Sequence, residues 1–349
     1  MSLLSGLRLE RARASKQFRD GRFHNETGAT VALKGSSLPV IGEFFFGGRA
    51  RVPRSPLPVT SPLEGWAQPV GRSGLRVTWL GHSTTLLEMD GVRVLTDPVF
   101  GARASPVSFA GPKRFHPTPA SIDELPELDA ILLSHDHYDH LCIESLRLLA
   151  RRATTIVTSL GVGARLERLG FEPARIVELD WWEERSMLAG KLSFTATPAQ
   201  HFSGRSLGDR NATLWSSWVV RTDRHRVFFS GDTGLTEAFR DVGRRLGPFD
   251  LTLLEIGAFH PAWGDIHLGP ENALTAFEWL GGGALLPVHW GTFDLALHAW
   301  DEPAETLLAL AEARGARVLT PSLGAPCEPA EVEGATPWWR PSEGSRSGG

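Results

Sequence analysis

The middle of the chain alternates apolar and polar positions in the way that is typical of β-strands. Residues 75–81 and 84–98 both alternate with a period of two, and the second stretch contains the turn pair Asp90 and Gly91. The pattern predicts a β-hairpin whose turn is formed by these two residues.

Further strands are predicted where short apolar runs end at polar residues. Residues 129–134 form a continuous apolar run that predicts a buried strand, and residues 143–152 after them have helical spacing. The later predicted strands of this kind are 191–201, 216–232, 251–257 and 284–290. Strand-like and helical stretches therefore alternate, which favours an α/β fold.

Composition divides the chain into zones. We expect residues 1–70, rich in Arg, Pro and Gly, to be an N-terminal extension that packs on the core. Residues 71–328 are expected to form the catalytic domain and residues 329–349 a C-terminal tail.

The basic segment 8–19 is predicted to be helical, and two interpretations of it stay open. Its few apolar residues can pack on the core, or its arginines can meet anionic headgroups while Phe44, Phe45 and Phe46 enter the lipid. The phenylalanines also suit burial in the core or in a dimer contact.

Overall composition is that of an ordinary globular enzyme. Charged residues make up 22% of the chain and the formal net charge is -4, so the basic excess of nucleic-acid binders is missing. Two cysteines, Cys142 and Cys327, cannot build a disulfide framework, which favours a reducing compartment. Neither an apolar run long enough to span a membrane nor a signal peptide is evident, so we expect a cytoplasmic protein.

The candidate chemistry lies directly after the predicted strand 129–134. The stretch HDHYDH places three histidines and two aspartates in six positions, an arrangement that is costly to bury unless a divalent metal compensates it. His135 and His137 can point one way along an extended loop, while Asp139 and His140, past a turn, reach a neighbouring point. One short loop therefore predicts ligands for two metal positions.

Three more candidate ligands follow other predicted strands. His201, Asp232 and His289 each lie just past a strand's carboxyl end, and α/β folds gather such ends at one edge. In SGDTG, glycines flank Asp232 and allow the backbone to approach closely, so this carboxylate is suited to bridge two metals.

These motifs resemble a known superfamily. SHDHYDHL, PAQH, SGDTG and PVHWGTF look like the metal-binding motifs of the metallo-β-lactamase superfamily, which implies a four-layered αββα sandwich. TWLGHSTTLLEMDGVRVLTDPVF, GPKRF, ELDWWEE, WSSW and GPFDL extend the resemblance to the N-acyl-phosphatidylethanolamine-hydrolysing phospholipase D family. The similarity runs from SKQFRDGRFHN to about TPSLGAP.

The resemblance implies a dinuclear centre with all ligand types present. One zinc would be held by His135, His137 and His201, a second by Asp139, His140 and His289, with Asp232 bridging both. Imidazole and carboxylate do not select strongly among metals, so iron or manganese would also fit.

The implied chemistry is hydrolysis by metal-generated hydroxide. We expect Asp139 and His267 to be the catalytic residues, Asp139 as a metal ligand and His267 as the proton donor or orienting group. His267, in GDIHLGPENA, matches a histidine near the family's active site; a surface-loop histidine is the alternative reading.

Four more residues are candidates for supporting roles. Asp97 is expected to hydrogen-bond a ligand imidazole, whereas structural and functional roles stay open for His82. Lys113 and Arg114 could face a phosphate or lie at the surface.

The predicted function is a dinuclear zinc phosphodiesterase of phospholipase D type that cleaves N-acyl-phosphatidylethanolamine-like lipids to N-acylethanolamine and phosphatidic acid. A hydrolase of a small soluble phosphodiester or lactone on the same fold is the first alternative, and a non-catalytic metal-dependent binding or sensing module is the second. We expect no nucleic-acid partner, whereas peripheral membrane contact and the homodimer that the family suggests stay open.

Overall fold

A computed structural model describes residues 3–26, 50–206, 208–260 and 263–340. Within these residues most strands belong to two sheets. The seven-stranded sheet has the order β15-β3-β4-β5-β6-β7-β8, with bounds β3 Leu75–Gly81, β4 Thr84–Met89, β5 Val92–Thr96, β6 Ala130–Leu133, β7 Thr155–Ser159, β8 Ile176–Leu179 and β15 Pro326–Cys327. The six-stranded sheet has the order β14-β13-β12-β11-β10-β9, with bounds β9 Glu184–Met187, β10 Leu192–Thr197, β11 Ser217–Arg221, β12 Arg226–Phe229, β13 Leu251–Glu255 and β14 Ala284–Val288.

Each sheet combines an antiparallel and a parallel part. Strands β3, β4 and β5 pair antiparallel, and β5 to β8 pair parallel. In the second sheet β9 to β12 pair antiparallel, and β12 to β14 pair parallel. The parallel part of each sheet therefore presents several carboxyl ends at one edge, as the sequence predicts.

Alternate side chains of the strands explain how the layers stack. Leu132 of β6 and Phe229 of β12 belong to one apolar cluster, whereas Ile131 and Leu133 of β6 pack into another with Leu146. Because successive residues of a strand face opposite sides, one face of the first sheet meets the second sheet and the other meets helices. The fold is thus the predicted αββα sandwich.

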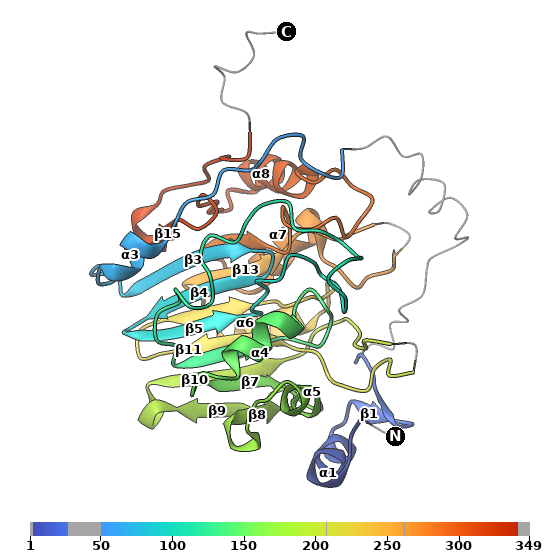
Figure 1. Cartoon of the computed structure of the whole chain (residues 1–349). Helices are drawn as coiled ribbons and strands as arrows, with labels where there is room; N and C mark the ends of the chain where they lie inside the picture. The colour runs from blue at the N-terminus through green and yellow to red at the C-terminus, as the bar shows by residue number, and fades with distance from the viewer. Residues whose placement is uncertain (1–2, 27–49, 207, 261–262, 341–349) are drawn as a thin grey trace, which may run out of the picture.

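The helices that cover the outer faces are short. Helices α4 and α5 pack on the seven-stranded sheet, and α6, α7 and α8 on the six-stranded one; Figure 1 shows α7 and α8 on one side of the strands and α5 on the other. Their bounds are α3 Leu63–Ala67, α4 Ile143–Leu149, α5 Gly163–Arg168, α6 Ala238–Leu246, α7 Gly269–Trp279 and α8 Glu302–Arg314. Short 3-10 turns η1, η2 and η4 cover Pro173–Arg175, Leu188–Gly190 and Pro329–Glu331.

Most elements predicted from the pattern are present, but residues 216–232, expected to form one strand, form two antiparallel strands, β11 and β12. Strands β4 and β5 form the expected hairpin, with Met89 paired to Val92 across Asp90 and Gly91. The helix predicted over residues 143–152 is shorter, because α4 ends at Leu149.

The N-terminal segment packs on the sandwich through α1 (Gly6–Ala14) and a hairpin of β1 (Phe18–Arg19) and β2 (Arg22–Phe23), beside α5 in Figure 1. Arg8 bonds Glu178 at 2.5 Å and Glu167 at 2.9 Å.

Ion pairs therefore hold part of the basic helix α1 against the sandwich. Arg11 adds an ion pair to Glu183 at 2.6 Å. The other residues of the membrane-contact interpretation, Phe44, Phe45 and Phe46, lie outside the described residues. No helix in the described parts of the chain has the length and apolar character needed to cross a bilayer.

Candidate metal centre

The polar residues that follow the strands converge at one edge of the sandwich. His135 lies two residues after β6, His201 four residues after β10, and His289 directly after β14. Asp232 follows β12 by three residues, and all four side chains are buried. Both sheets therefore supply the site.

One cluster consists of three imidazoles. His137 Nδ1 lies 2.9 Å from His135 Nε2 and 3.2 Å from His201 Nε2. His201 Nδ1 donates to the carbonyl oxygen of Ile266 at 2.9 Å; a carbonyl can only accept, so Nδ1 carries the proton. The lone pair of His201 Nε2 therefore faces His135 and His137, as a metal ligand requires.

A second cluster lies beside the first. Asp139 Oδ2 is 3.3 Å from His289 Nε2 and 3.6 Å from His140 Nε2. His140 Nδ1 donates to the carboxylate of Asp97 at 2.6 Å, which leaves Nε2 of His140 as the atom that faces the cluster.

Asp232 joins the two clusters through one oxygen. Its Oδ2 lies 3.1 Å from His140 Nε2 and 3.2 Å from His289 Nε2. The same oxygen is 3.7 Å from His201 Nε2 and 3.8 Å from His135 Nε2. One carboxylate oxygen therefore lies close to imidazole nitrogens of both clusters.

The site is chemically suited to cations. His140 Nε2 and Asp232 Oδ1 are buried and have no hydrogen-bond partner among the described residues. Burial disfavours the charged form of His289, yet the carboxylates of Asp232 and Asp139 raise its pKa to about 10. The negative charge thus attracts positive charge strongly, and the nitrogen and oxygen donors without thiolates fit a hydrolytic zinc site.

Glycines let the loop of Asp232 come close to its neighbours, as the sequence indicates. Gly231 has φ +54°, and a Cβ there would lie 2.7 Å from Ser134 Cβ. At Gly234 a Cβ would meet the backbone oxygen of Asp265 at 1.7 Å. A side chain at either position would push Asp232 away from the histidines.

Asp97 hydrogen-bonds His140, one of the predicted metal ligands. The side chain is fully buried, and its Oδ1 accepts the Ser134 backbone N–H at 2.7 Å. Its Oδ2 accepts from Ser134 Oγ and His140 Nδ1, both at 2.6 Å. Asp97 therefore fixes both the start of the HDHYDH loop and the orientation of His140.

His82 lies inside the second cluster. Its Nε2 is 3.1 Å from Asp139 Oδ2, and its ring lies 4.1 Å from that of His289. Burial, with the nearby His289, lowers the pKa of His82 to about 3, so the ring is neutral. As a neutral imidazole, His82 can donate from Nε2 and orient the Asp139 carboxylate.

Sequence reasoning missed Glu255, at the end of β13. Its side chain is fully buried, and its Oε2 accepts from His267 Nδ1 at 2.7 Å. Its Oε1 accepts the backbone N–H of Thr233 at 2.6 Å, next to Asp232. The signal was present, because Glu255 is the only charged residue in LTLLEIG and stands at a strand's carboxyl end.

His267 is placed at the centre rather than on a remote surface. Its ring lies 5.1 Å from the ring of His201 and 5.4 Å from that of His289. The Glu255 carboxylate raises the pKa of His267 despite burial. His267 also lines a pocket of about 280 Å³ with Phe259, Trp263 and other residues of the same loop.

Lys113 and Arg114 differ in their surroundings. Lys113 is exposed, whereas Arg114 is buried and donates to the backbone oxygens of Val99 and Gly101. Burial lowers the pKa of Arg114 to about 10. Arg114 thus stabilises the loop that follows β5 through hydrogen bonds to its backbone.

The second aspartate of the HDHYDH stretch points away from both clusters. Asp136 is fully buried and bonds Arg165 Nε at 2.6 Å and the backbone N–H of Gly204 at 2.8 Å. It therefore ties the HDHYDH loop to the segment that follows His201.

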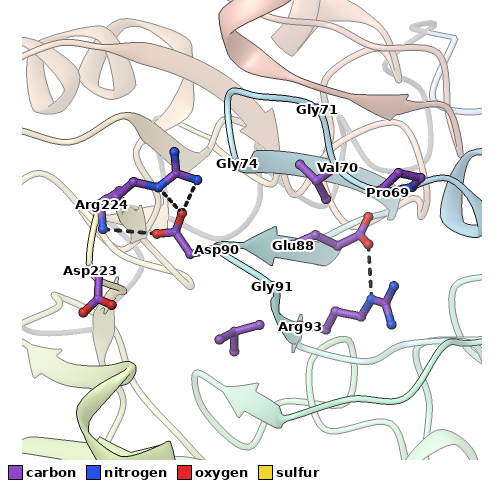
Figure 2. Close-up of a pocket in the computed structure, with 11 residues that line it drawn as sticks. Pro69, Val70, Gly71, Gly74, Glu88, Asp90, Gly91, Arg93, Asp223 and Arg224 are labelled. Atoms are coloured by element: carbon purple, nitrogen blue, oxygen red, sulfur yellow. Dashed lines mark hydrogen bonds and ion pairs between the residues drawn. The ribbon is translucent and has the colours of Figure 1, made fainter.

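A separate pocket of about 650 Å³ lies at the amino ends of β5 and β12, away from the metal centre. Figure 2 shows Asp90 and Arg224 pointing toward one another there, with Nε to Oδ1 at 2.7 Å. Glu88 meets Arg93 at 3.2 Å in the same view. These charges are paired with one another.

The comparisons agree with this geometry. The model of the β-lactamase superfamily domain matches residues 92–290. A solved isothiocyanate hydrolase from Delia radicum gut bacteria has a TM-score of 0.58 at 23% identity, covering 72% of this chain and 98% of that one, and so shares the fold. Fold and site define a metal-dependent hydrolase of the metallo-β-lactamase superfamily.

Relatives in sequence narrow the class. An uncharacterized protein of Mycobacterium tuberculosis is 46% identical over 334 residues, which cover 93% of this chain and 88% of the relative. The N-acyl-phosphatidylethanolamine-hydrolyzing phospholipase D 1 of Caenorhabditis elegans is 37% identical over 253 residues, 69% of this chain and 71% of the relative. Within the superfamily, the chain belongs to the family of N-acyl-phosphatidylethanolamine-hydrolysing phospholipases D.

Proposed function

We propose that this protein is a dinuclear zinc phosphodiesterase of phospholipase D type. The observation that carries the dinuclear centre is the reach of Asp232 Oδ2, which lies within 3.8 Å of imidazole nitrogens in both clusters. The ligands proposed for one zinc are His135, His137 and His201, those for the other are Asp139, His140 and His289, and Asp232 bridges.

The proposed substrate is an N-acyl-phosphatidylethanolamine-like lipid, and the products are N-acylethanolamine and phosphatidic acid. The name of the Caenorhabditis elegans relative supports this choice over a lactone. A bilayer substrate has to be met at its surface, so the proposal includes a cytoplasmic protein in peripheral contact with the membrane. The proposal also includes a homodimer, because the family suggests one.

When bound, two divalent ions would supply hydroxide at neutral pH and neutralise charge on the phosphoryl oxygens. In the proposed reaction, the hydroxide that the ions would supply adds to phosphorus, and the bond from phosphorus to the ethanolamine oxygen would break. His267 donates the proton that the leaving alkoxide takes up. Glu255 holds His267 Nδ1, so that Nε2 is the donating atom.

A product-resolved assay tests the proposal. Zinc-loaded protein and its His135→Ala variant are incubated with vesicles of N-acyl-phosphatidylethanolamine, and the products are analysed by mass spectrometry. Phosphatidic acid and N-acylethanolamine from the wild type alone are the expected result.

Two other outcomes select the alternatives. Hydrolysis of bis(p-nitrophenyl) phosphate or of a lactone without lipid products would move the substrate to a small soluble molecule. Metal binding without any hydrolysis would leave a binding or sensing module.

A further inference from the structure

We propose that Asn25 is a positioning residue for the metal ligand His201, so that the N-terminal segment controls the affinity of the metal position formed by His135, His137 and His201. The inference rests on the metal centre of the proposed function and not on its lipid substrate. Asn25 lies in the GRFHN motif, outside the residues matched by the superfamily model.

The contact between Asn25 and His201 uses both ends of one amide. Asn25 Oδ1 accepts the backbone N–H of His201 at 3.0 Å, and Asn25 Nδ2 donates to the backbone oxygen of the same residue at 2.9 Å. Asn25 is 6% exposed and His201 1%. The two hydrogen bonds are therefore shielded from water, and losing them would leave buried backbone groups unpaired.

The backbone at His201 depends on such a partner because it has left the sheet. Strand β10 ends at Thr197, and no strand among the described residues pairs with residue 201. The ring of His201 is held separately by the carbonyl oxygen of Ile266. Asn25 fixes the backbone and Ile266 fixes the ring, so together they determine where Nε2 lies.

Asn25 is itself held in place by the core. Trp215 Nε1 donates to Asn25 Oδ1 at 3.1 Å, and Trp215 is 1% exposed. Two residues earlier, Phe23 is fully buried, and its backbone N–H donates to the carbonyl oxygen of Asn211 at 2.8 Å. The amide of Asn25 is therefore positioned before any metal binds.

The competing explanation is that Asn25 only helps to anchor the N-terminal segment. Arg11 provides a matched control, because it anchors the same segment through Glu183 and the backbone oxygen of Glu178 at 2.7 Å. Its partners lie on β8 and on the β8–β9 connection and do not include the loop of His201. A general loosening of the segment would follow from Arg11→Ala as well.

Two substitutions test the amide. Asn25→Ala removes both hydrogen bonds. Asn25→Asp keeps the size and an acceptor for the His201 N–H, but it replaces the donating Nδ2 by an oxygen that faces the His201 carbonyl. Metal-free wild type, both variants and Arg11→Ala are titrated with Zn²⁺ against a chromogenic chelator, and the visible spectra of the Co²⁺ forms are compared.

The expected result is two ions per wild-type chain, with one of the two bound about 10- to 100-fold more weakly by Asn25→Ala and Asn25→Asp. The Co²⁺ spectrum of that position changes in both variants. Arg11→Ala stays within about twofold of wild type, as surface substitutions usually do.

Wild-type affinity and spectrum in a folded Asn25 variant would overturn the inference, and so would an equal loss in Arg11→Ala. If circular dichroism shows that Asn25→Ala does not fold, the zinc affinity and Co²⁺ spectrum of Asn25→Asp provide the test. Fewer than two ions in the wild type would instead count against the dinuclear centre, while the ratio of variant to wild-type affinity still judges Asn25.

Discussion

Glu255 Oε2 accepts a hydrogen bond from His267 Nδ1 at 2.7 Å, and the carboxylate has no solvent exposure. Burial raises the pKa of Glu255, whereas the carboxylate raises the pKa of His267. The pair therefore fixes the tautomer of an imidazole beside the metal ligands.

Replacing Glu255 by Gln should lower turnover more than substrate affinity. An amide can present its NH₂ group to Nδ1 and favour the wrong tautomer of His267, so we expect kcat to fall about 10- to 100-fold. Steady-state kinetics and zinc analysis of the same preparation measure this. Glu271→Gln, an exposed position on α7, is the control, and unchanged kcat in Glu255→Gln would contradict the role.

His267→Ala should retain both metals and lose about 100-fold or more in turnover. The imidazole does not belong to the proposed ligand set, so its removal takes away the proton donor only. Zinc content is measured together with hydrolysis of a substrate whose leaving group needs no proton, such as bis(p-nitrophenyl) phosphate. A similar loss of turnover with N-acyl-phosphatidylethanolamine and with bis(p-nitrophenyl) phosphate would argue against proton donation.

Asp97→Asn should weaken metal binding at the position of His140 about 10- to 100-fold. The variant loses the charge that accepts from His140 Nδ1 and Ser134 Oγ. Zinc titration of the metal-free protein measures the effect, with exposed Asp123→Asn as control. Unaltered affinity would show that His140 is oriented without Asp97.

Asp90→Asn should lower stability at neutral pH by about 1 to 2 kcal/mol, a range that allows for solvent screening of Arg224. Burial of Asp90 works against its charge, but hydrogen bonds from Thr222, Arg224 and His225 prevail and lower its pKa to about 2. A depressed folded-state pKa stabilises the protein above the unfolded value of about 3.9. This stabilisation is lost as the pH falls toward the folded value.

Urea unfolding of wild type and Asp90→Asn between about pH 7 and pH 3 measures this dependence. The difference between the two proteins should be constant near neutrality and should shrink below about pH 4. Asp241→Asn is the control, since its partner Arg244 lies on the surface. A difference that does not change with pH would exclude Asp90 as its source.

Chelation should abolish hydrolysis, and added Zn²⁺ should restore it. Because ligands that bind only the folded state stabilise it, the melting temperature should fall in the chelator and rise again with metal. Activity and thermal unfolding are followed in one titration. Full activity of the metal-free protein would contradict hydrolysis by metal-generated hydroxide.

Sequence patterns predicted the strands well because each buried strand carries its own apolar run. The spacing of HDHYDH and the polar ends of later strands brought together residues that the fold does place side by side. Glu255 was missed because its role depends on His267, twelve positions away on another element. Asn25 was out of reach for the same reason, since its partner lies 176 positions along the chain.

Arg114 shows a different limit of sequence reasoning. A basic pair in a loop is compatible with phosphate binding, but the conformation of the loop decides which atoms the guanidinium meets. In the folded chain these are the backbone oxygens of Val99 and Gly101.

The division of the ligands between the two sheets affects how the centre can be assembled. His135 and His137 follow a strand of the first sheet, whereas His201 and Asp232 follow strands of the second. A chain cut between β8 and β9 would give two fragments, neither of which holds a complete ligand set. Such fragments would recover zinc binding only on reassociation, so metal uptake would report the docking of the two halves.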